Sequence, residues 1–269
     1  MAQRSTSRTG RAVISARVDG RQRPHASNSV SDWRAALATG VASAALFAYG
    51  GRPVRAQTVP PAAPCNQISG TSGEIVTCSG DVSTGVLINS GSPFSTLNVG
   101  NLTTNITPAS GDDGIFFTSV GGVTVNSNTG PFAIIATGAG ADGIEARSTG
   151  AGAVTVTSSG DITSALATGI RAYSVSGAVA VTTAGTITAG GDGIFAQTGN
   201  ATVTVDNTAD IFAGARGIFA SSLNEDLSVS SEGNIQSVGR GIDAHTNGDL
   251  TIESTGDIAT TGSAEGIYA

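Results

Sequence analysis

The sequence contains no lysine, and it is poor in aromatic residues. Aromatic side chains make up 4% of the 269 residues, and there is one tryptophan and one methionine. A conventional globular core is built on large apolar side chains, so this composition argues against one. Without lysine, the isolated arginines of the later chain provide no basic patch of the kind that binds phosphate backbones. We therefore expect no nucleic acid partner.

The charged residues divide the chain in two. Nine arginines and two acidic residues precede Gln57, which gives +7, whereas four arginines and eighteen acidic residues follow from Gln57 onward, which gives −14. The basic start leads into an apolar run at residues 35–49, shorter than the roughly 20 residues that cross a bilayer. Val54 and Ala56 occupy the small-residue positions of a signal-peptidase site. This layout predicts a signal peptide over residues 1–56, cleaved between Ala56 and Gln57; a membrane anchor is the alternative.

A proline-rich linker and a cysteine pair follow the predicted cleavage site. Residues 57–64 include the segment TVPPAAP, in which proline removes amide donors and disfavours helix. Cys65 and Cys78 are the only two cysteines. In an exported chain such a pair predicts a disulfide that stabilises by about 3 kcal/mol. Two thiolates without a nearby histidine do not complete a tetrahedral metal site, so we expect no metal there.

Glycine is abundant, with 38 residues, and a Gly-Ile dipeptide recurs at nearly constant spacing. The dipeptides begin at Gly114, Gly143, Gly169, Gly193, Gly217, Gly241 and Gly266, so the later units repeat at about 24 residues and the first ones at slightly more. Gly85-Val86 is a degenerate earlier copy. About ten residues after each dipeptide comes a pair of alternating aliphatic residues, such as Val203 and Val205. A third segment then carries an isoleucine preceded by Asp, Asn or Thr, such as Ile211. Each unit thus predicts three short strands joined by polar turns.

Three strands in about 24 residues leave one repeat architecture. A propeller blade needs about 40 residues, and the units lack both the leucines of leucine-rich repeats and the stripe of helical repeats. The remaining fold class is all-β: a right-handed parallel β-helix, a solenoid with coils of about 24 residues, stacked into three parallel sheets. We assign residues 65–269 to it. The Gly-Ile dipeptide recurs because each isoleucine must pack on the isoleucine of the previous coil.

The residue that follows each Gly-Ile dipeptide points outward and forms a column along the stack. The column is predicted to read Phe116, Glu145, Arg171, Phe195, Phe219, Asp243 and Tyr268. This register predicts an ion pair between Glu145 and Arg171, a cation–π contact between Arg171 and Phe195, and stacking of Phe195 on Phe219. Arg171, Phe195 and Phe219 are therefore candidate surface contacts. The simpler interpretation is that these side chains stabilise the strand face.

The chain resembles the passenger domains of Gram-negative autotransporters, the type V secretion proteins. The resemblance rests on the long leader, the proline-rich start, the segment GEIVTCSGD and the tandem coils, and it covers nearly all of residues 1–269. It implies secretion or display at the cell surface and a role as an adhesin or stalk, with host or neighbouring-cell surface molecules as partners. Such passengers are anchored through an outer-membrane β-barrel, whereas this sequence stops within a coil at EGIYA. We expect a truncated chain whose terminal coil permits end-to-end self-association.

Two kinds of enzyme are alternatives to this interpretation. A serine hydrolase needs a base, and His245, the single histidine after Gln57, lies two residues from Asp243 without a nucleophile elbow. A β-helical polysaccharide lyase uses calcium-binding carboxylates with a basic residue. Its candidates are Asp112, Asp113, Asp142 and Asp192, together with Arg171, Arg216 or Arg240. The aspartates do not continue along the stack, and the short coils leave no loops for a substrate groove. We therefore expect no catalytic site and no cofactor. The alternatives are a polysaccharide lyase or other carbohydrate-active protein, and a pure structural spacer.

Overall fold

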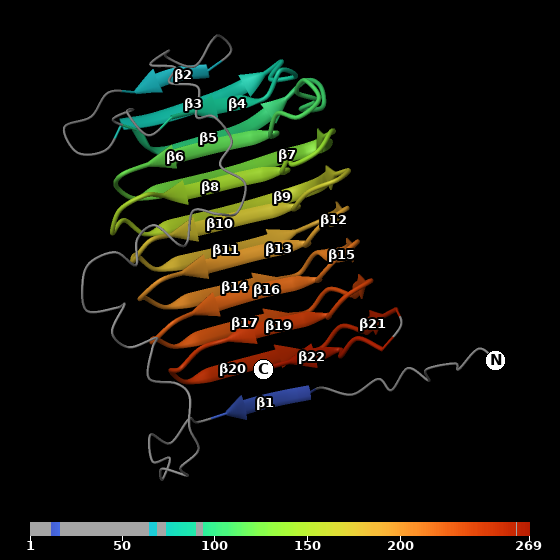
Figure 1. The fold of residues 1–269 in the computed structure, drawn as a ribbon. Coiled ribbons are helices and arrows are strands. Elements are labelled where there is room, and N and C mark those ends of the chain that lie inside the picture. The colour runs from blue at the N-terminus through green and yellow to red at the C-terminus, as the bar shows by residue number, and fades with distance from the viewer. Residues whose placement is uncertain (1–11, 17–64, 69–73, 90–93, 262) are drawn as a thin grey trace. The chain divides into compact units, whose positions relative to one another are not determined.

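In the computed structural model, residues 12–16, 65–68, 74–89, 94–261 and 263–269 are described (Figure 1). These residues form strands and turns, and none of them is helical. The predicted fold class is confirmed: the chain is all-β, with parallel strands stacked as a solenoid. Except for one strand, the predicted signal peptide (1–56) lies outside the described residues. So do the cleavage site between Ala56 and Gln57 and the linker at 57–64.

The strands that begin with the Gly-Ile dipeptides form one parallel sheet of eight strands. In stacking order they are β4 (Val86–Ile88), β6 (Ile115–Ser119), β8 (Ile144–Ser148), β10 (Ile170–Ser174), β13 (Ile194–Thr198), β16 (Ile218–Ser222), β19 (Ile242–His245) and β22 (Ile267–Tyr268). Eight strands correspond to eight coils. The degenerate Gly85-Val86 unit belongs among them, because Val86 pairs with Ile115.

The second and third segments of the coils lie in one sheet of 14 strands. The early coils contribute β3 (Glu74–Gly80), β5 (Phe94–Leu102), β7 (Val123–Ala136) and β9 (Val154–Ser164). From β9 the sheet divides into two branches. One branch holds β11 (Val179–Ala184), β14 (Val203–Asn207), β17 (Leu227–Ser231) and β20 (Leu250–Ser254); the other holds β12 (Thr186–Ala189), β15 (Asp210–Ala213), β18 (Ile235–Ser237) and β21 (Ile258–Thr260).

Two further strands complete this sheet at its ends. β2 (Cys65–Ile68) pairs antiparallel with β3, and Cys65 forms the predicted disulfide bond with Cys78. β1 (Ala12–Ala16), a part of the predicted leader, pairs antiparallel with β20. All other strand pairs of the described residues are parallel, as expected for successive coils.

The prediction of three separate sheets holds only for the later coils. In β7 and β9 one continuous strand serves both the second and the third segment. The chain turns the corner there at residues with positive φ, Gly130 (61°) and Gly160 (109°), and an earlier corner uses Asn101 (50°). Such a residue bends the chain sharply without ending the strand pairing on either side. The periodicity of the sequence predicts the second and third segments. It does not predict whether they form one continuous strand or two.

The core consists of aliphatic columns in register. Ile170, Ile194 and Ile218 pair with one another in adjacent coils and are fully buried. Valines and leucines at the second segment form the next column. Isoleucines at the third segment form another, which includes the pair Ile187 and Ile211. These pairings confirm that the repeated dipeptide places isoleucine on isoleucine.

The glycine of the dipeptide is required by space. A Cβ atom on Gly217 would collide with Cγ2 of Ile235 in its own coil and would lie 2.5 Å from the carbonyl oxygen of Gly241 in the next. The same two contacts recur at the earlier dipeptides. Gly217 is not among the glycines with positive φ, so conformational freedom is not the reason. The third-segment isoleucine therefore packs in the gap that the missing side chain leaves, and the two motifs depend on each other.

The polar residue before the third-segment isoleucine holds adjacent coils together. Asp161 Oδ1 accepts a hydrogen bond from the amide of Thr186 at 3.0 Å, and Asp210 Oδ1 accepts one from the amide of Asn234 at 2.9 Å. Asn234 Oδ1 accepts in turn from the amide of Asp257 at 3.1 Å. These side chains satisfy turn amides that the strand ladder does not reach. The recurring Asp or Asn is therefore structural.

Candidate functional site

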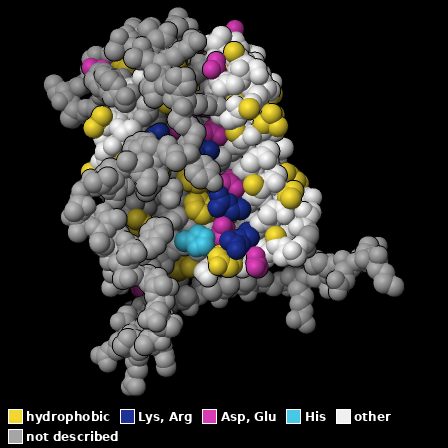
Figure 2. All heavy atoms as spheres, in the orientation of Figure 1, with side chains coloured by type: hydrophobic (Ala, Val, Ile, Leu, Met, Phe, Trp, Pro, Cys, Tyr) yellow, Lys and Arg dark blue, Asp and Glu magenta, His cyan; other side chains and the backbone are white. Residues whose placement is uncertain are grey.

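The outer face of the eight-stranded sheet holds the four arginines that follow Gln57, together with several acidic and aromatic side chains. Figure 2 shows arginine, acidic, histidine and hydrophobic side chains in one band on this side of the molecule. All four arginines that follow Gln57 stack on aromatic rings here. The pairs are Arg147 over Tyr173 at 5.4 Å, Arg171 over Phe195 at 5.3 Å, Arg216 over Phe219 at 3.8 Å and Arg240 over Tyr268 at 3.5 Å, measured from Cζ to the ring centroid.

The predicted column of outward residues is present in register, with one correction. Arg171 lies over Phe195, and the rings of Phe195 and Phe219 stack with centroids 4.9 Å apart. The carboxylate that binds Arg171 is Asp142 rather than the predicted Glu145: Arg171 Nε donates to Asp142 Oδ2 at 2.8 Å. The side chain of Asp142 is only 4% exposed and is held in place by another hydrogen bond, so it offers a fixed and desolvated partner.

A network of charges continues this face toward the last coils. Arg216 donates to Asp192 at 2.7 Å and to Asp243 at 3.3 Å, and Arg240 donates to Asp243 at 3.0 Å and to Glu265 at 3.2 Å. Asp243 is the centre of this network, with its side chain 4% exposed. Because each arginine contacts two carboxylates and the two arginines share Asp243, the net charge of the network is small. It therefore stabilises the sheet face without presenting a strong electrostatic field.

The ionisation of the network follows from these contacts. Burial lowers the pKa of the Arg216 guanidinium, but the hydrogen bonds and negative charges of Asp192 and Asp243 outweigh it, so the pKa is raised from its ordinary value. The pKa of Glu265 is lowered, first by a backbone hydrogen bond and then by Arg240. Both shifts favour the charged forms. Arg216 and Glu265 thus stay charged at neutral pH.

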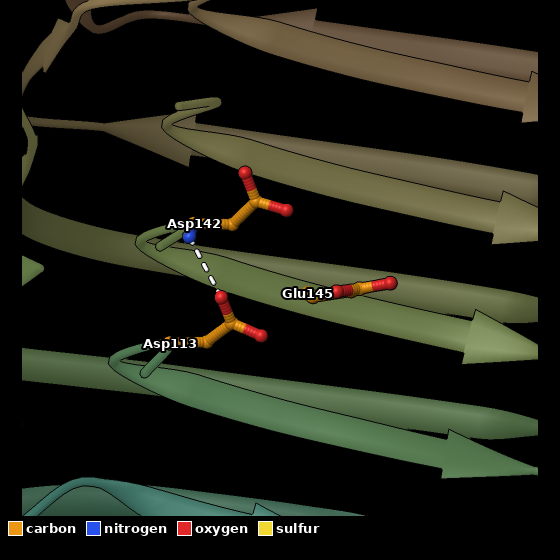
Figure 3. Close-up of side chains that lie close together, drawn as sticks. All are labelled: Asp113, Asp142 and Glu145. Atoms are coloured by element: carbon orange, nitrogen blue, oxygen red, sulfur yellow. Dashed lines mark hydrogen bonds between the residues drawn. The ribbon is translucent and has the colours of Figure 1, made fainter. Parts of the chain in front are cut away.

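Three carboxylates lie close together at the other end of this face. One oxygen each of Asp113, Asp142 and Glu145 can be chosen so that all lie within 4.8 Å of one another (Figure 3). Asp113 and Asp142 stand at equivalent corners of adjacent coils and are 9% and 3% exposed. Asp113 Oδ1 accepts from the amide of Asp142 at 2.7 Å, and Asp142 Oδ1 accepts from the amide of Thr168 at 2.8 Å. The two aspartates therefore serve the backbone of the following coil, and Asp142 also binds the Arg171 cation.

This role gives the first testable prediction. Asp142→Ala removes the acceptor of the buried Thr168 amide and the partner of Arg171, so we expect the free energy of unfolding to fall by about 1–3 kcal/mol. Asp142→Asn keeps the acceptor oxygen and is expected to lose less. Chemical denaturation followed by circular dichroism measures both values. An alanine variant as stable as the asparagine variant would show that the amide does not depend on this oxygen.

The other candidate residues of the two enzyme alternatives are dispersed. Asp112 is exposed, whereas Asp192 lies two coils beyond Asp142 and is bound to Arg216. His245 Nε2 lies 2.9 Å from Asp243 Oδ1, and its side chain is 44% exposed. The structure thus brings Asp113 and Asp142 together with Arg171. It does not join them to Asp192, Arg216 or Arg240.

Sequence reasoning named Glu145 and Asp243 in the outward column but missed their contacts with the corner residues. Glu145 lies close to Asp113 and Asp142 because a corner residue lies beside the strand of its own coil and of the next coil. The outward column alone does not show that these residues are neighbours. Asp243 is expected in the outward column and as a neighbour of His245, and it also binds two arginines from the corner positions before Gly217 and Gly241. Aligning the corner residues together with the outward column would have revealed both contacts.

The fold and its side-chain ladders define a parallel β-solenoid protein. Searches against protein-family models, curated proteins and solved structures returned no match to the chain. Within the part of the chain that the structure describes, no helix has the length and apolar character needed to cross a membrane.

Proposed function

We propose that the chain is a non-catalytic passenger of the autotransporter type, secreted or displayed on the surface of a Gram-negative cell, where it acts as an adhesin or stalk. The observation that carries the proposal is the in-register stack of eight coils, because each coil bonds only to its neighbours and the solenoid lengthens with every repeat. The predicted leader and the cysteine pair support export. An outer-membrane translocator is the expected anchor, and surface molecules of a host or neighbouring cell are the expected partners.

The use of the polar side chains supports a structural rather than a catalytic role. Asp161 and Asp210 bind turn amides, Asp142 binds an amide and an arginine, and Asp192 and Asp243 bind arginines. A general acid or base needs a group with a perturbed pKa that faces substrate, whereas these carboxylates already have cationic or amide partners. These carboxylates connect each coil to a neighbouring coil through hydrogen bonds and ion pairs.

Export can be tested in the cells that produce the protein. We expect an antibody against the solenoid to label intact cells, and mass spectrometry of the exported protein to find Gln57 at its N-terminus. A cytoplasmic protein is the control for cell integrity, since it must stay unlabelled until the cells are permeabilised. Protein that begins at Met1 and is labelled only after permeabilisation would refute the proposal.

Adhesin and stalk differ in what the removal of one coil does. Deleting residues 193–216, one repeat interval, joins Asp192 to Gly217 and restores the repeat. A stalk becomes shorter and leaves attachment to surfaces unchanged, whereas an adhesin whose contacts include Phe195 attaches less. Electron microscopy measures the length, and counting of attached cells measures adhesion.

The lyase alternative has one favourable observation, the proximity of Asp113, Asp142 and Glu145 to Arg171. It predicts release of unsaturated sugars from anionic polysaccharides in the presence of calcium, followed by ultraviolet absorbance. That activity would have to disappear in Arg171→Ala. Product release that is abolished in this way would replace the proposed function.

A further inference from the structure

We propose that the early coils bind an uncharged glycan in an open groove on the outer face of β3, β5, β7 and β9. The proposal rests on the proposed function, since it names the class of partner that an adhesin of this fold would hold. The groove has a volume of about 440 Å³, within the range of small-ligand sites. It lies on the 14-stranded sheet, whereas the arginine–aromatic face belongs to the eight-stranded sheet.

The groove is lined by a row of neutral hydrogen-bonding side chains from four successive coils. Thr77 pairs with Asn98, Asn98 with Asn126, and Asn126 with Thr157. Within this row Asn126 Nδ2 donates to Asn98 Oδ1 at 2.9 Å, which fixes the orientation of both amides. Four strands at about 4.8 Å spacing extend over about 14 Å, which accommodates a few sugar residues.

Room for a ligand comes from the second row of the groove. Ser79, Asn128 and Ser159 contribute small polar side chains, and Gly100 contributes none. A Cβ atom on Gly100 would meet only the carbonyl oxygen of Asn128, at 3.5 Å, which is an ordinary contact. The backbone there does not need glycine for packing, as the Gly-Ile dipeptides do. Glycine at this position keeps the groove open.

The chemistry of the lining selects an uncharged ligand. None of the described residues that line it is ionisable, because Cys78 is in the disulfide bond and the others are Thr, Ser, Asn, Val and Gly. Carboxylates enter the same row only beyond the groove, at Asp206 and Glu253. The net charge of −14 from Gln57 onward also repels anionic polymers.

A glycan fits this surface better than a peptide does. Amide and hydroxyl side chains both donate and accept hydrogen bonds, as do the hydroxyl groups of a sugar. An extended peptide binds mainly by adding a strand to a sheet edge, where backbone groups are unpaired. The groove lies on a sheet face, and the backbones of β5 and β7 are already paired with their neighbours.

Native gels that contain a dissolved polysaccharide test the proposal with the folded protein. The neutral probes are galactomannan, mixed-linkage β-glucan and dextran, and the anionic probes are polygalacturonate and chondroitin sulfate. We expect retardation by at least one neutral probe, unchanged by moderate salt. Gly100→Leu should fill the groove and weaken binding at least tenfold while the unfolding midpoint stays the same or rises. Asn126→Ala should also weaken binding.

The matched control is Asn224→Ala. Asn224 Nδ2 donates to Asn200 Oδ1 at 2.9 Å, the same contact as in the groove but at an exposed turn elsewhere. This variant is expected to bind as the unmodified chain does. The proposal is overturned if no neutral probe retards the protein, if only anionic probes do, or if Gly100→Leu binds normally. Any of these results leaves surface labelling of intact cells unaffected, so the failure of the glycan site is distinguishable from the failure of the proposed function.

Discussion

Ile194→Asp is expected to unfold the coils around it. Ile194 lies between Ile170 and Ile218 in the isoleucine column, and all three side chains are fully buried. A carboxylate in this position has no cation or donor to pair with, so its burial costs far more than the lost apolar contacts. We expect the free energy of unfolding to fall by more than about 4 kcal/mol, the range reserved for severe core lesions. Circular dichroism and thermal unfolding measure the loss of strand content.

The neighbouring residue supplies the control for Ile194→Asp. Phe195 follows Ile194 on the same strand but points outward, where it stacks on Phe219 and lies under Arg171. Phe195→Ser removes these contacts without burying a polar group, and we expect a cost of about 1 kcal/mol. Strand content and melting of Ile194→Asp that equal those of the unmodified chain would contradict the inward orientation of the isoleucine column.

Gly217→Ala is expected to destabilise the solenoid although it adds a single methyl group. That group would collide with Ile235 Cγ2 and would lie 2.5 Å from the carbonyl oxygen of Gly241, so one coil must shift relative to the next. Overpacking of this kind costs about 1–3 kcal/mol. Urea denaturation measures the change. In most strands the same substitution would stabilise, because alanine restricts the unfolded chain more than glycine does.

Gly266 provides a control from the same motif. It begins the last Gly-Ile dipeptide, and a Cβ atom there would meet only Ile258 Cγ2, at 3.7 Å. Since no further coil of the described residues stacks on it, Gly266→Ala should change the free energy of unfolding by no more than about 0.5 kcal/mol. Equal effects at Gly217 and Gly266 would mean that stacking between coils is not the reason for the glycine.

The repeat in the sequence is sufficient to predict the solenoid. The regular interval between the dipeptides places Ile194 on Ile218 and Val203 on Leu227, and the structure has these pairs. The register follows from the sequence because a slip by one residue would turn every aliphatic side chain of a strand to solvent. The outward column, and hence the stacking of Phe195 on Phe219, is determined by the same register.

The corners between strands are less predictable. The sequence suggests that Glu145 binds Arg171, since both lie in the outward column, but Arg171 binds Asp142. The corner residues recur at the position before each dipeptide but differ in type from coil to coil, and their side chains can reach along the stack or across to the strand. Their partners depend on how the backbone turns, which differs between the longer early coils and the shorter later ones.

The sequence alone determined the fold class, the disulfide partners and the identity of the inward columns, because each depends on spacing and side-chain type. Only the tertiary structure decided why the dipeptide needs glycine, since the atoms that would collide with a side chain at Gly217 belong to Ile235 on another strand and to Gly241 in the next coil. It also decided that the second and third segments share one sheet in the early coils and that their outer face contains a groove. The bends themselves involve residues with positive φ, at Asn101, Gly130 and Gly160, a backbone conformation that no apolar pattern encodes.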